Sequence, residues 1–448
     1  MYVLGLDIGT TSHCAAVIDL ESGAVPWTRS IPGPGFLASP RPYERIQDPA
    51  SILENVRRLI DMAEREFPIS AIGVTGQMHG ILYLDKSGES VSPLYTWQDG
   101  SGAQPFREQE TFAEFLTRHA ALPVRPGYGA STYFCHFNQH RVPQEACCFS
   151  TIHDWIVMKL CSLPRPLTHP SDAASLGMFC LETGRFDQKS IEDCGMDFSF
   201  FPEIADEPVC GRFRGKIPVA AAIGDNQASF LGSVQSPEDS VLVNIGTGSQ
   251  VSFWIPSPRP LSVGEIRPSA DGGFLAVGSS LCGGRAYAIL EGFFRQVLEM
   301  AGSGGERALY DSMEEAARKA DAPFPQFSTL FCGTREDPSL RASIQNLSEE
   351  NFTPGHLIRA AMEGIAGELF QFYRDMGPFP AKQIIGSGNG LRRNKLLREI
   401  LQEMFRLPLK TAPYQEEAAI GAAIFASRTC LSLGPRDFTI PYHEEDVV

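Results

Sequence analysis

A short glycine turn occurs twice in this chain, and the repeat constrains the fold more than any other feature. DIGTTS at 7–12 and NIGTGS at 244–249 share Ile, Gly, Thr and Ser at matching positions. Each copy follows an apolar run and precedes a second β-like run. Two copies of strand, tight turn and strand, one at the start of each half, indicate a duplicated domain. Coincidence in a chain with 42 glycines is the alternative.

The spacing of apolar residues predicts a mixed α/β fold around these turns. Strands are predicted at 2–6, 13–20, 71–75 and 382–385. Helices are predicted at 51–67, 356–376, 394–405 and 416–427. The last of these helices is rich in small residues and is expected to pack closely on a neighbour. Segments 303–309 and 432–448 show no regular pattern.

Residues 202–218 are rich in Pro and Gly and lack periodicity, which is typical of a connection between domains. The apolar run VAAAIG follows directly. A boundary near 218–222 is therefore predicted, with an N-terminal domain at 1–218 and a C-terminal domain at 219–448. At about 150 residues per domain, a chain of 448 residues has room for two or three cores.

Composition excludes several classes of protein. The formal net charge is −15, from 38 basic and 53 acidic residues, which argues against a nucleic-acid binder because phosphate contacts need a basic face. No apolar run approaches the ~20 residues of a membrane span. The first residues, MYVLGLDIG, lack the basic region of a secretory signal. A soluble, cytoplasmic protein is therefore expected.

The eleven cysteines are scattered from Cys14 to Cys430, with no CxxC pair and no zinc-type spacing. Buried reduced thiols are expected. Cys147 and Cys148 are adjacent, and we expect them to face different directions rather than to pair.

The repeated turns have the composition of a phosphate site. Glycine lets the backbone approach a ligand closely, and the amides and hydroxyls of the turn can surround phosphate oxygens. Two such turns, one per domain, would hold a polyphosphate from opposite sides of a cleft. The first copy has Asp7 where the second has Asn244, and a carboxylate beside phosphates is a natural site for hydrated Mg²⁺. Two ordinary hairpin turns are the alternative.

Asp225 follows the run VAAAIG and is expected at the end of a strand, where clefts of α/β proteins form. A carboxylate there can accept the proton of a substrate hydroxyl that attacks a γ-phosphorus. It need not be a strong base, because positioning dominates phosphoryl transfer. A cap for a helix that begins at Asn226 is the alternative.

Three further clusters carry polar groups at predicted strand ends. GSGNG at 386–390 is a glycine-rich loop, but no acidic residue occurs at 406–411, where a dinucleotide site would need one. A surface for adenosine is therefore preferred to a purely structural helix start. QMHG at 77–80 and WQDG at 97–100 offer the donors, acceptors and stacking face of a polyol site, with structural roles as the alternative.

Taken in order, DIGTTS, GQMHG, GDNQAS, NIGTGS and GSGNGLRRN resemble the motifs of the FGGY carbohydrate kinases. The resemblance covers nearly the whole chain. It implies an α/β, actin-like ATPase fold, in which two duplicated ribonuclease-H-like domains lie around a central cleft. It also implies phosphorylation of the primary hydroxyl of a small-molecule sugar, with ATP and Mg²⁺.

Four segments are similar to the branch of that family that converts sedoheptulose to sedoheptulose 7-phosphate. They are TWQDG at 96–100, TIHD at 151–154, LCSLPRP at 160–166 and SDAAS at 171–175. Ser101 stands where an arginine is expected, and NIGTGS is closer to the general form of the family. Activity on xylulose or another polyol therefore stays open.

The resemblance also implies roles for the matching residues. Asp225 would be the general base, and Asp7 would organise Mg²⁺. The residues expected to contact ATP are Thr11 and Ser12 at its phosphates, Gly246 and Thr247 at the γ-phosphate, and Gly388, Asn389 and Arg393 at adenosine. The residues expected to line the sugar pocket are Gln77, Met78, His79, Trp97, Asp99 and Asn226.

Two other classes of protein compete with the sugar kinase. An actin-fold ATPase without a sugar substrate would hydrolyse ATP with no sugar dependence. A dehydrogenase would use the 386–390 loop for NAD(H), and the residues at 406–411 count against it. The sequence does not reveal the oligomeric state, and a homodimer stays a hypothesis. Closure of the two halves around substrate is expected, because phosphoryl transfer must exclude water.

Overall fold

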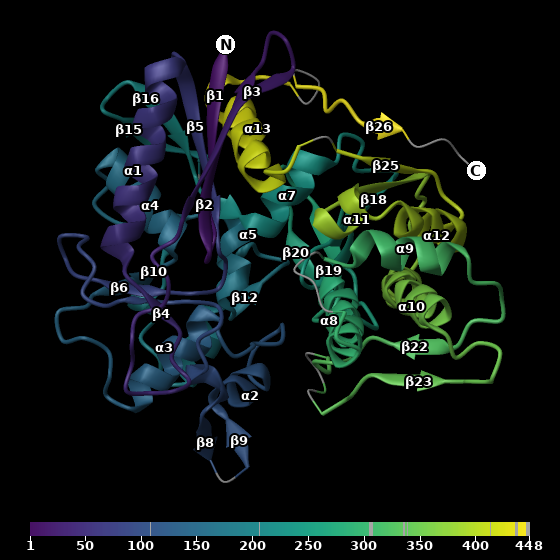
Figure 1. Ribbon diagram of the computed structural model, residues 1–448. Helices are drawn as coiled ribbons and strands as arrows, with labels where there is room; N and C mark the ends of the chain where they lie inside the picture. The colour runs from purple at the N-terminus through teal and green to yellow at the C-terminus, as the bar shows by residue number, and fades with distance from the viewer. Residues whose placement is uncertain are drawn as a thin grey trace. The chain divides into compact units, whose positions relative to one another are not determined.

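Figure 1 shows the computed structural model, which describes residues 1–107, 109–205, 207–303, 308–334, 337, 339–412, 414–434 and 438–444. The chain forms two compact units. The first unit comprises Met1–Gln235, Arg267–Gly273 and Glu416–Ile440. The second unit comprises Ser236–Ile266, Phe274–Gln415 and Pro441–Val448.

The first unit is built on a sheet with the strand order β15-β16-β5-β1-β2-β3. Its strands are β1 (Tyr2–Ile8), β2 (Ser12–Asp19), β3 (Ala24–Pro32), β5 (Ile69–Gly76), β15 (Val209–Phe213) and β16 (Ile217–Ala220). β1 pairs antiparallel with β2 and parallel with β5, and the short strand β17 (Ile223–Gly224) also pairs with β5. The strands predicted at 2–6, 13–20 and 71–75 are confirmed.

Helices cover both faces of this sheet. α1 (Pro49–Glu66) and α4 (Ile152–Cys161) share a hydrophobic core with alternate residues of β1. α13 (Glu417–Leu431) packs on β1 and β5 from the other face and contacts α7 (Asp225–Ser233). Figure 1 shows α1 and α13 on opposite sides of β1 and β2. The helix predicted at 51–67 is confirmed as α1.

Glycines allow α13 to approach its neighbours closely. A β-carbon at Gly5 of β1 would lie 1.7 Å from the carbonyl oxygen of Ala419 in α13. A β-carbon at Gly421 of α13 would lie 1.8 Å from the carbonyl oxygen of Ala228 in α7. No side chain fits at such distances from a backbone atom. The prediction that 416–427 forms a closely packed helix of small residues is confirmed.

A second core of the first unit lies in the long segment between β5 and β15 and is rich in aromatic side chains, including Tyr83, Phe134 and Phe149. Besides α4, the helices of this segment are α2 (Phe112–Thr117), α3 (Gly129–Asn138), α5 (Pro170–Ala173) and α6 (Gln188–Asp193). Its strands are β6 (Leu82–Leu84), β7 (Leu94–Tyr95), β8 (Pro105–Arg107), β9 (Glu110–Thr111), β10 (Cys148–Ser150), β11 (Leu167–Thr168), β12 (Phe179–Cys180), β13 (Arg185–Phe186) and β14 (Glu203–Ile204). β7 pairs with β4 (Ile46–Gln47).

The second unit contains a sheet with the order β20-β21-β19-β18-β24-β25-β26. Its strands are β18 (Ser240–Ile245), β19 (Ser249–Ile255), β20 (Glu265–Pro268), β21 (Phe274–Ser280), β24 (Gln383–Ser387), β25 (Leu409–Thr411) and β26 (His443–Glu444), and β22 (Gln326–Ser328) pairs separately with β23 (Ser343–Gln345). Its helices are α8 (Gly284–Met300), α9 (Tyr310–Arg318), α10 (Pro354–Asp375), α11 (Asn389–Arg393) and α12 (Lys395–Phe405). The elements predicted at 356–376, 382–385 and 394–405 are confirmed.

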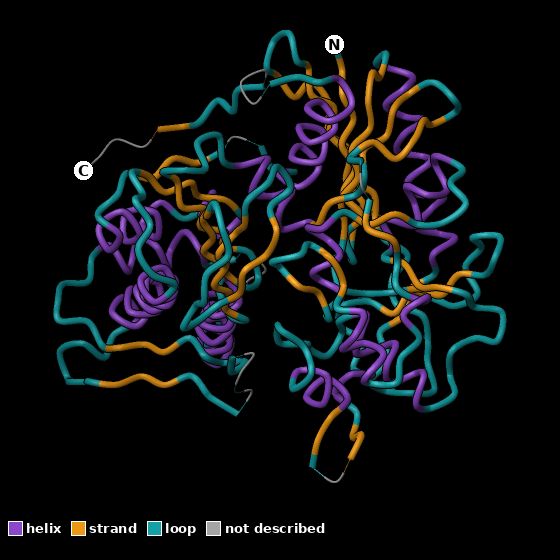
Figure 2. Tube along the Cα trace, turned by 180° about the vertical axis from the view of Figure 1, so that it is seen from behind, coloured by secondary structure: helices purple, strands orange, loops and turns teal. Residues whose placement is uncertain are grey.

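The two sheets repeat one arrangement. The order β3-β2-β1-β5-β16 in the first unit corresponds to β21-β19-β18-β24-β25 in the second. β1 and β18 each pair antiparallel with the next strand and parallel with a later one. Figure 2 colours the strands of both sheets orange and their helices purple. The duplication inferred from the two glycine turns is confirmed, because both turns follow the equivalent strand.

The segment 202–218 differs from its prediction as a connection. β15 and β16 pair as an antiparallel hairpin, and β15 is an edge strand of the first sheet. An edge strand is partly exposed, so it does not need the continuous apolar run of a strand that is buried on both faces. The compact units divide after Gln235 rather than at 218–222, because α7 packs against α13 within the first unit.

The segment 432–448 was expected to be irregular, and it contains β26, while residues 304–307, 435–437 and 445–448 lie outside the described residues. Among the helices that the structure describes, none is long and apolar enough to cross a bilayer. All eleven cysteines are free thiols, and the buried ones are Cys14, Cys135, Cys148 and Cys282.

Candidate active site

Asp7 lies near the end of β1, beside the first glycine turn. Alternation along the strand places Ile8 in the core with α1 and α4, whereas Gly5 lies against α13. Asp7 therefore shares the face that meets α13, a helix whose N-cap residue is Glu416. Burial raises the pKa of Asp7 to about 7, and repulsion from Asp225 and Glu416 adds to the rise. Three carboxyl groups thus converge at this end of the sheet.

Asp225 is the first residue of α7 and directly follows β17. Thr75 holds this strand in place, since its Oγ1 donates to a carbonyl oxygen of β17 over 2.7 Å. The N-cap residue of α7 is Gly224, so Asp225 is not the helix cap of the alternative interpretation. Burial raises the pKa of Asp225, while Arg267 and His153 oppose the rise electrostatically. The acid lies at a strand end, as the sequence predicts.

Met78 packs over the residue that precedes Asp225. A β-carbon at Gly224 would lie 2.6 Å from Met78 Cε and 2.5 Å from Gln227 Oε1. The neighbouring Asn226 has a buried Oδ1 atom, for which the described residues provide no hydrogen-bond partner. A hydroxyl of a ligand would satisfy this acceptor. The structure therefore brings Met78 and an open acceptor to the side of Asp225.

Thr10 joins the first glycine turn to both predicted polyol clusters. Its Oγ1 donates to Gln77 Oε1 and accepts from Trp97 Nε1, each over 3.1 Å. Its carbonyl oxygen accepts from Gln47 Nε2 over 2.8 Å, and Gln47 Oε1 in turn accepts from Gln77 Nε2 over 3.0 Å. Trp97 is 47% exposed, so a ligand can reach this residue beside the network.

Thr11 and Ser12 complete the first turn. Thr11 is exposed, and its carbonyl oxygen accepts from the amide of Gly33 over 2.9 Å, which ties the turn to the end of β3. Ser12 begins β2. Both predicted phosphate contacts thus lie within a few residues of Asp7.

His79 has an uncommon backbone conformation. Its φ is +75°, a left-handed value that is rare outside glycine and that clusters at ligand sites. Ser175 holds it there, because the His79 amide donates to Ser175 Oγ over 3.2 Å and His79 Nδ1 lies 2.7 Å from the Ser175 carbonyl oxygen. The imidazole ring also stacks on Tyr128, with 4.4 Å between the ring centroids.

Among the predicted sugar contacts, Asp99 is the one whose carboxylate is bound by backbone amides of the protein itself. It is buried, and its carboxylate accepts from the amides of Arg45 and Ser101 over 3.2 Å and 2.9 Å. This geometry favours a role in shaping the loop after Trp97, and a contact between Asp99 and a sugar stays a prediction. Ser101, which stands where an arginine is expected, is fully buried with its Oγ 3.4 Å from His136 Nε2.

In the second unit, the other glycine turn lies beside the glycine-rich loop. β18 and β24 are parallel neighbours, so Gly246 and Thr247 follow one strand and Gly388 and Asn389 follow the next. Asn244 Nδ2 of β18 donates to the hydroxyl of a serine in β24 over 2.6 Å. The left-handed Gly388, with φ +84°, packs so closely that a β-carbon would lie 2.5 Å from the carbonyl oxygen of the residue before Gly246. Arg393, at the end of α11, is exposed.

The sequence analysis did not identify Gly283 and Gly284, which lie beside the glycine turn of the second unit. Gly283 and Gly284 begin α8 against the glycine turn, and the Gly284 amide donates to the Gly246 carbonyl oxygen over 2.9 Å. The Arg285 amide likewise donates to the Thr247 carbonyl oxygen over 3.0 Å. In the sequence, this helix start could have been identified from the glycine pair that follows a β-like run. Such a pair is typical of close backbone packing.

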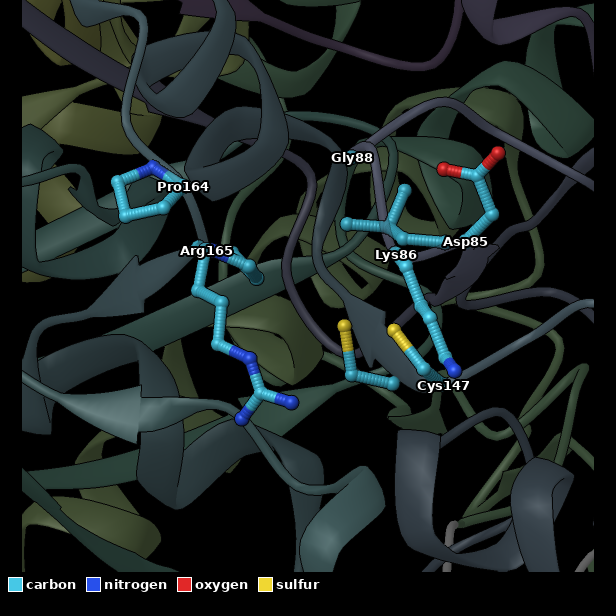
Figure 3. A pocket seen from close by; sticks show the side chains of 9 residues that line it. Asp85, Lys86, Gly88, Cys147, Pro164 and Arg165 are labelled. Carbon is cyan, nitrogen blue, oxygen red and sulfur yellow. The ribbon is translucent and has the colours of Figure 1, made fainter.

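A pocket of about 90 Å³ in the first unit contains none of the predicted site residues (Figure 3). It is lined in part by Lys86, Arg165, Cys147 and Cys148. The two cysteines were expected to face different directions, yet both line this pocket, because Cys147 precedes β10 and is outside the regular strand. Burial raises the pKa of Cys148 to about 12, so its thiol stays protonated at neutral pH.

Known proteins resemble the chain over nearly its whole length. Sedoheptulokinase from Mus musculus is 29% identical, covering 96% of this chain and 98% of that protein. Glycerol kinase from Thermus brockianus is 26% identical, covering 94% of this chain and 88% of that protein. The crystal structure of ligand-bound xylulose kinase from Lactobacillus acidophilus has a TM-score of 0.85 at 20% identity, covering 99% of this chain and 93% of that chain.

Family models match both units. The model for the N-terminal domain of the FGGY family of carbohydrate kinases matches residues 2–232, and the model for its C-terminal domain matches residues 241–430. Together with the structural likeness, these matches confirm the duplicated, actin-like ATPase fold. The chain therefore belongs to the FGGY family of carbohydrate kinases.

Proposed function

We propose that this carbohydrate kinase transfers the γ-phosphate of ATP to the primary hydroxyl of sedoheptulose and forms sedoheptulose 7-phosphate. One observation carries the proposal: Asp225 lies at a strand end beside Met78 and beside the open acceptor of Asn226. The likeness to mouse sedoheptulokinase, over 96% of the chain, supports this choice of sugar. Another ketose, such as xylulose, is the second candidate, supported by the likeness to the Lactobacillus xylulose kinase.

In the proposed reaction, Asp225 is the general base. The sugar oxygen forms a bond to the γ-phosphorus while the bond from that phosphorus to the leaving oxygen of ADP breaks, and the hydroxyl proton moves to a carboxylate oxygen of Asp225. The transition state is loose, so the base mainly orients the hydroxyl and removes its proton late. Burial raises the pKa of Asp225, which brings the group closer to the operating pH of a base.

The donors around Asp7 fit a hydrated Mg²⁺ ion. This cation prefers carboxylate oxygens and keeps several of its waters. Repulsion from Asp225 and Glu416 contributes to the raised pKa of Asp7, and a divalent cation would relieve that repulsion. We assign Asp7 and Glu416 to the ion and keep Asp225 as the base. When bound, Mg²⁺ neutralises charge on the phosphate oxygens of ATP.

Asp7→Asn is expected to raise the Mg²⁺ concentration needed for half-maximal turnover by about 10- to 100-fold, because one charged donor is lost. Without Mg²⁺, the same variant should be more stable than the wild type at pH 8. Ionisation of Asp7 destabilises the folded chain as the pH rises from 3.8 to about 7, and asparagine removes this loss. Magnesium titrations of turnover and thermal unfolding at pH 5 and pH 8 measure both effects. An unchanged Mg²⁺ requirement would contradict the assignment.

We assign the nucleotide contacts to the two glycine turns and the glycine-rich loop. Their backbone amides and hydroxyls suit phosphate oxygens. The assigned residues are Thr11 and Ser12 in the first unit and Gly246, Thr247, Gly388, Asn389 and Arg393 in the second. The packing of Gly388 against the end of β18 supports the assignment, since it joins the loop to the glycine turn.

Trp97→Phe is expected to raise KM for the sugar by about tenfold with little change in kcat, because the ring keeps a stacking face but loses its hydrogen bond to Thr10. Trp27→Phe is the matched control. Trp27 Nε1 donates to Glu66 Oε1 over 3.0 Å, on a strand that is not part of the proposed site. Steady-state kinetics with varied sugar measure KM. Equal changes in the two variants would contradict a role of Trp97 in sugar binding.

The decisive experiment measures phosphorylated product with ATP and sedoheptulose, xylulose, ribulose, fructose or glycerol. The highest kcat/KM is expected for sedoheptulose. A clear preference for xylulose would replace the proposed substrate, and steady ATP hydrolysis with no sugar dependence would replace the proposed reaction with that of an actin-fold ATPase. The cytoplasmic location stays a hypothesis. So does the homodimer, which light scattering of the purified protein tests.

A further inference from the structure

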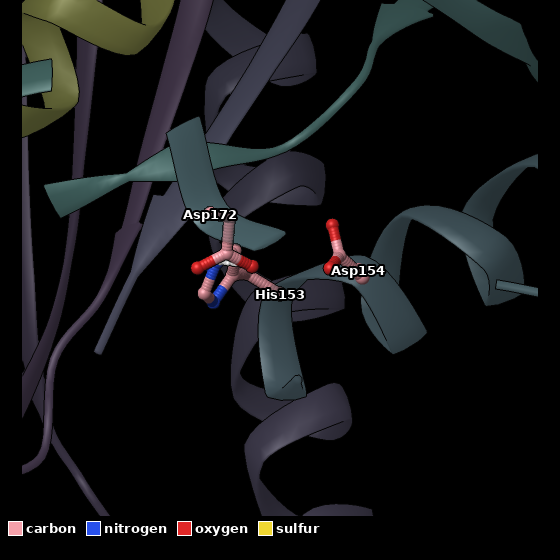
Figure 4. Close-up of side chains that lie close together, drawn as sticks. All are labelled: His153, Asp154 and Asp172. Atoms are coloured by element: carbon pink, nitrogen blue, oxygen red, sulfur yellow. Dashed lines mark ion pairs between the residues drawn. The ribbon is translucent and has the colours of Figure 1, made fainter. Parts of the chain in front are cut away.

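The first unit buries a cluster of three ionisable side chains that the proposed reaction does not use. His153 and Asp154 lie in the first turn of α4, and Asp172 lies on α5. All three are fully buried. In Figure 4 the imidazole of His153 lies against the carboxylate of Asp172, and His153 Nε2 is 2.8 Å from Asp172 Oδ2. Fully buried charged side chains are rare unless they are paired.

The cluster holds one positive and one negative charge. Burial alone would lower the pKa of His153, but Asp172 attracts its proton and raises the pKa to about 9. The same attraction keeps the pKa of Asp172 below its ordinary value in spite of burial. Burial and the charge of Asp172 raise the pKa of Asp154 well above its ordinary value. These shifts favour an imidazolium at His153, a carboxylate at Asp172 and the neutral form of Asp154.

Asp172 supports the left-handed backbone of His79, which belongs to the proposed sugar pocket, through Ser175. Asp172 Oδ1 accepts from Ser175 Oγ over 3.2 Å. The same Ser175 oxygen accepts from the amide of His79 over 3.2 Å. A continuous chain of contacts thus runs from His153 through Asp172 and Ser175 to the left-handed backbone of His79.

The cluster also faces the proposed base. α5, which carries Asp172, packs on β17, the strand that ends at Asp225. Gln227, two residues after Asp225, donates to the carbonyl oxygen of Ser171 over 3.1 Å. The charge of His153 lowers the pKa of Asp225, in opposition to burial and to the weaker effect of the Asp172 carboxylate.

We propose that the buried His153–Asp172 ion pair is a positioning element of the phosphotransfer site, which places a fixed positive charge near Asp225 and holds His79 in its left-handed conformation through Ser175. This inference rests on the proposed function, because it assigns the ion pair to the same base and the same sugar pocket. It predicts that removal of either partner affects the proton affinity of the base and the affinity for sugar together. Binding of ATP should be unaffected.

Several charged or titratable groups surround the pair, and the test must separate their effects. They are Asp154 on α4, Asp225 on α7, Asp7 on β1, Arg267, His169 beside Asp172, and Cys210 beside Asp154. His169 and Cys210 are held neutral at pH 7, since burial lowers the pKa of His169 to about 4 and raises that of Cys210 to about 12. The titration of His153 is therefore the change expected near pH 9.

The test compares His153→Gln and Asp172→Asn with the control Asp154→Asn. The control alters a carboxyl group of the same cluster, whose Oδ2 accepts from Thr151 Oγ1 over 2.8 Å. Because the raised pKa of Asp154 favours the neutral carboxyl group, asparagine matches that form and keeps the acceptor. The control is expected to retain the kcat/KM and the pH profile of the wild type.

For His153→Gln, the acidic limb of the kcat/KM profile should move to higher pH by about one unit, the usual effect of losing a nearby opposite charge. Asp172→Asn should move the limb less, because the carboxylate of Asp172 itself raises the pKa of Asp225. The acidic limb moves to higher pH because Asp225, without the imidazolium of His153 nearby, holds its proton to a higher pH. On that limb, kcat/KM at a given pH should fall by about tenfold for a shift of one unit and should return as the pH rises. KM for sugar should rise, and calorimetric affinity for ATP should stay constant.

Two results would overturn the proposal. One is an unmoved acidic limb in both variants, which would reduce the pair to a structural role. The other is an equal loss in Asp154→Asn, which would point to a resident metal ion, since the nearest ligand atoms of the three residues lie within 4.8 Å of one another.

A spectroscopic measurement separates failure of this proposal from failure of the proposed function. In ¹⁵N-histidine spectra of the wild type, His153 should carry both ring protons at pH 8, and its signals should change in Asp172→Asn. A neutral ring at pH 8 would overturn the proposal whatever the substrate is. A wild type that phosphorylates no ketose but keeps a doubly protonated His153 would overturn the proposed function. The charged pair would still be present, and it would then serve the phosphorylation of another acceptor.

Discussion

Asp225→Asn is expected to lower kcat for sugar phosphorylation by about 10²- to 10⁴-fold, the usual contribution of a general base. Asparagine keeps the size of the side chain at the start of α7, but it cannot accept the proton of the attacking hydroxyl. Affinity for ATP should not change, because the substitution leaves the glycine turns intact. A coupled assay of ADP release and a calorimetric titration with ATP measure the two quantities.

Asp61→Asn is the matched control for this variant. Asp61 is 46% exposed on α1, where its Oδ1 accepts from Arg214 over 2.8 Å. Loss of an exposed ion pair changes the free energy of unfolding by less than about 1 kcal/mol, so the control should keep full activity. Near-normal turnover by Asp225→Asn would show that another group removes the proton.

Gly5→Ala is expected to lower the free energy of unfolding of the first unit by at least about 3 kcal/mol, near the upper end of the usual effect of overpacking. The added β-carbon would lie 1.7 Å from the carbonyl oxygen of Ala419, a backbone atom that cannot turn aside. α13 would have to move away from β1 and would lose packing along its length. Thermal unfolding followed by circular dichroism measures the change.

Gly367→Ala makes the same substitution where space is free. Gly367 lies inside α10, and a β-carbon there would have no neighbouring atom within 4 Å. Alanine is the better helix former, so stability should rise by about 0.5–1 kcal/mol. A wild-type melting temperature for Gly5→Ala would mean that β1 and α13 are not as closely packed as the structure describes.

The chemical motifs were predictable because each is a local signal. An apolar run that ends in a glycine turn identifies a strand and the exposed amides after it, and this predicted β1 with Asp7 and β18 with Gly246. The same logic placed Asp225 after β17. Matching of the two turns predicted that the sheets would be duplicated, which the strand orders confirm.

Other features were not predictable from local patterns. Glu416 is close enough to raise the pKa of Asp7 only because α13 returns from the C-terminal part of the chain to pack on β1. The edge hairpin β15–β16 lacks the apolar run of a buried strand, so its residues were interpreted as a connection. The compact units divide after Gln235, because α7 packs against α13 within the first unit, and that contact between distant segments has no local signal.

The amino-acid sequence alone determined the duplicated fold, the two glycine turns and the acid at the strand end, because these depend on neighbours a few residues away. Only the tertiary structure decided which acids share a site and what charge they carry. His153 shows the difference, since an isolated histidine is neutral at pH 8, while the carboxylate of Asp172 raises the pKa of His153 to about 9 in spite of burial. The physical reason is that desolvation and charge pairing depend on the three-dimensional surroundings of a group, which local sequence does not contain.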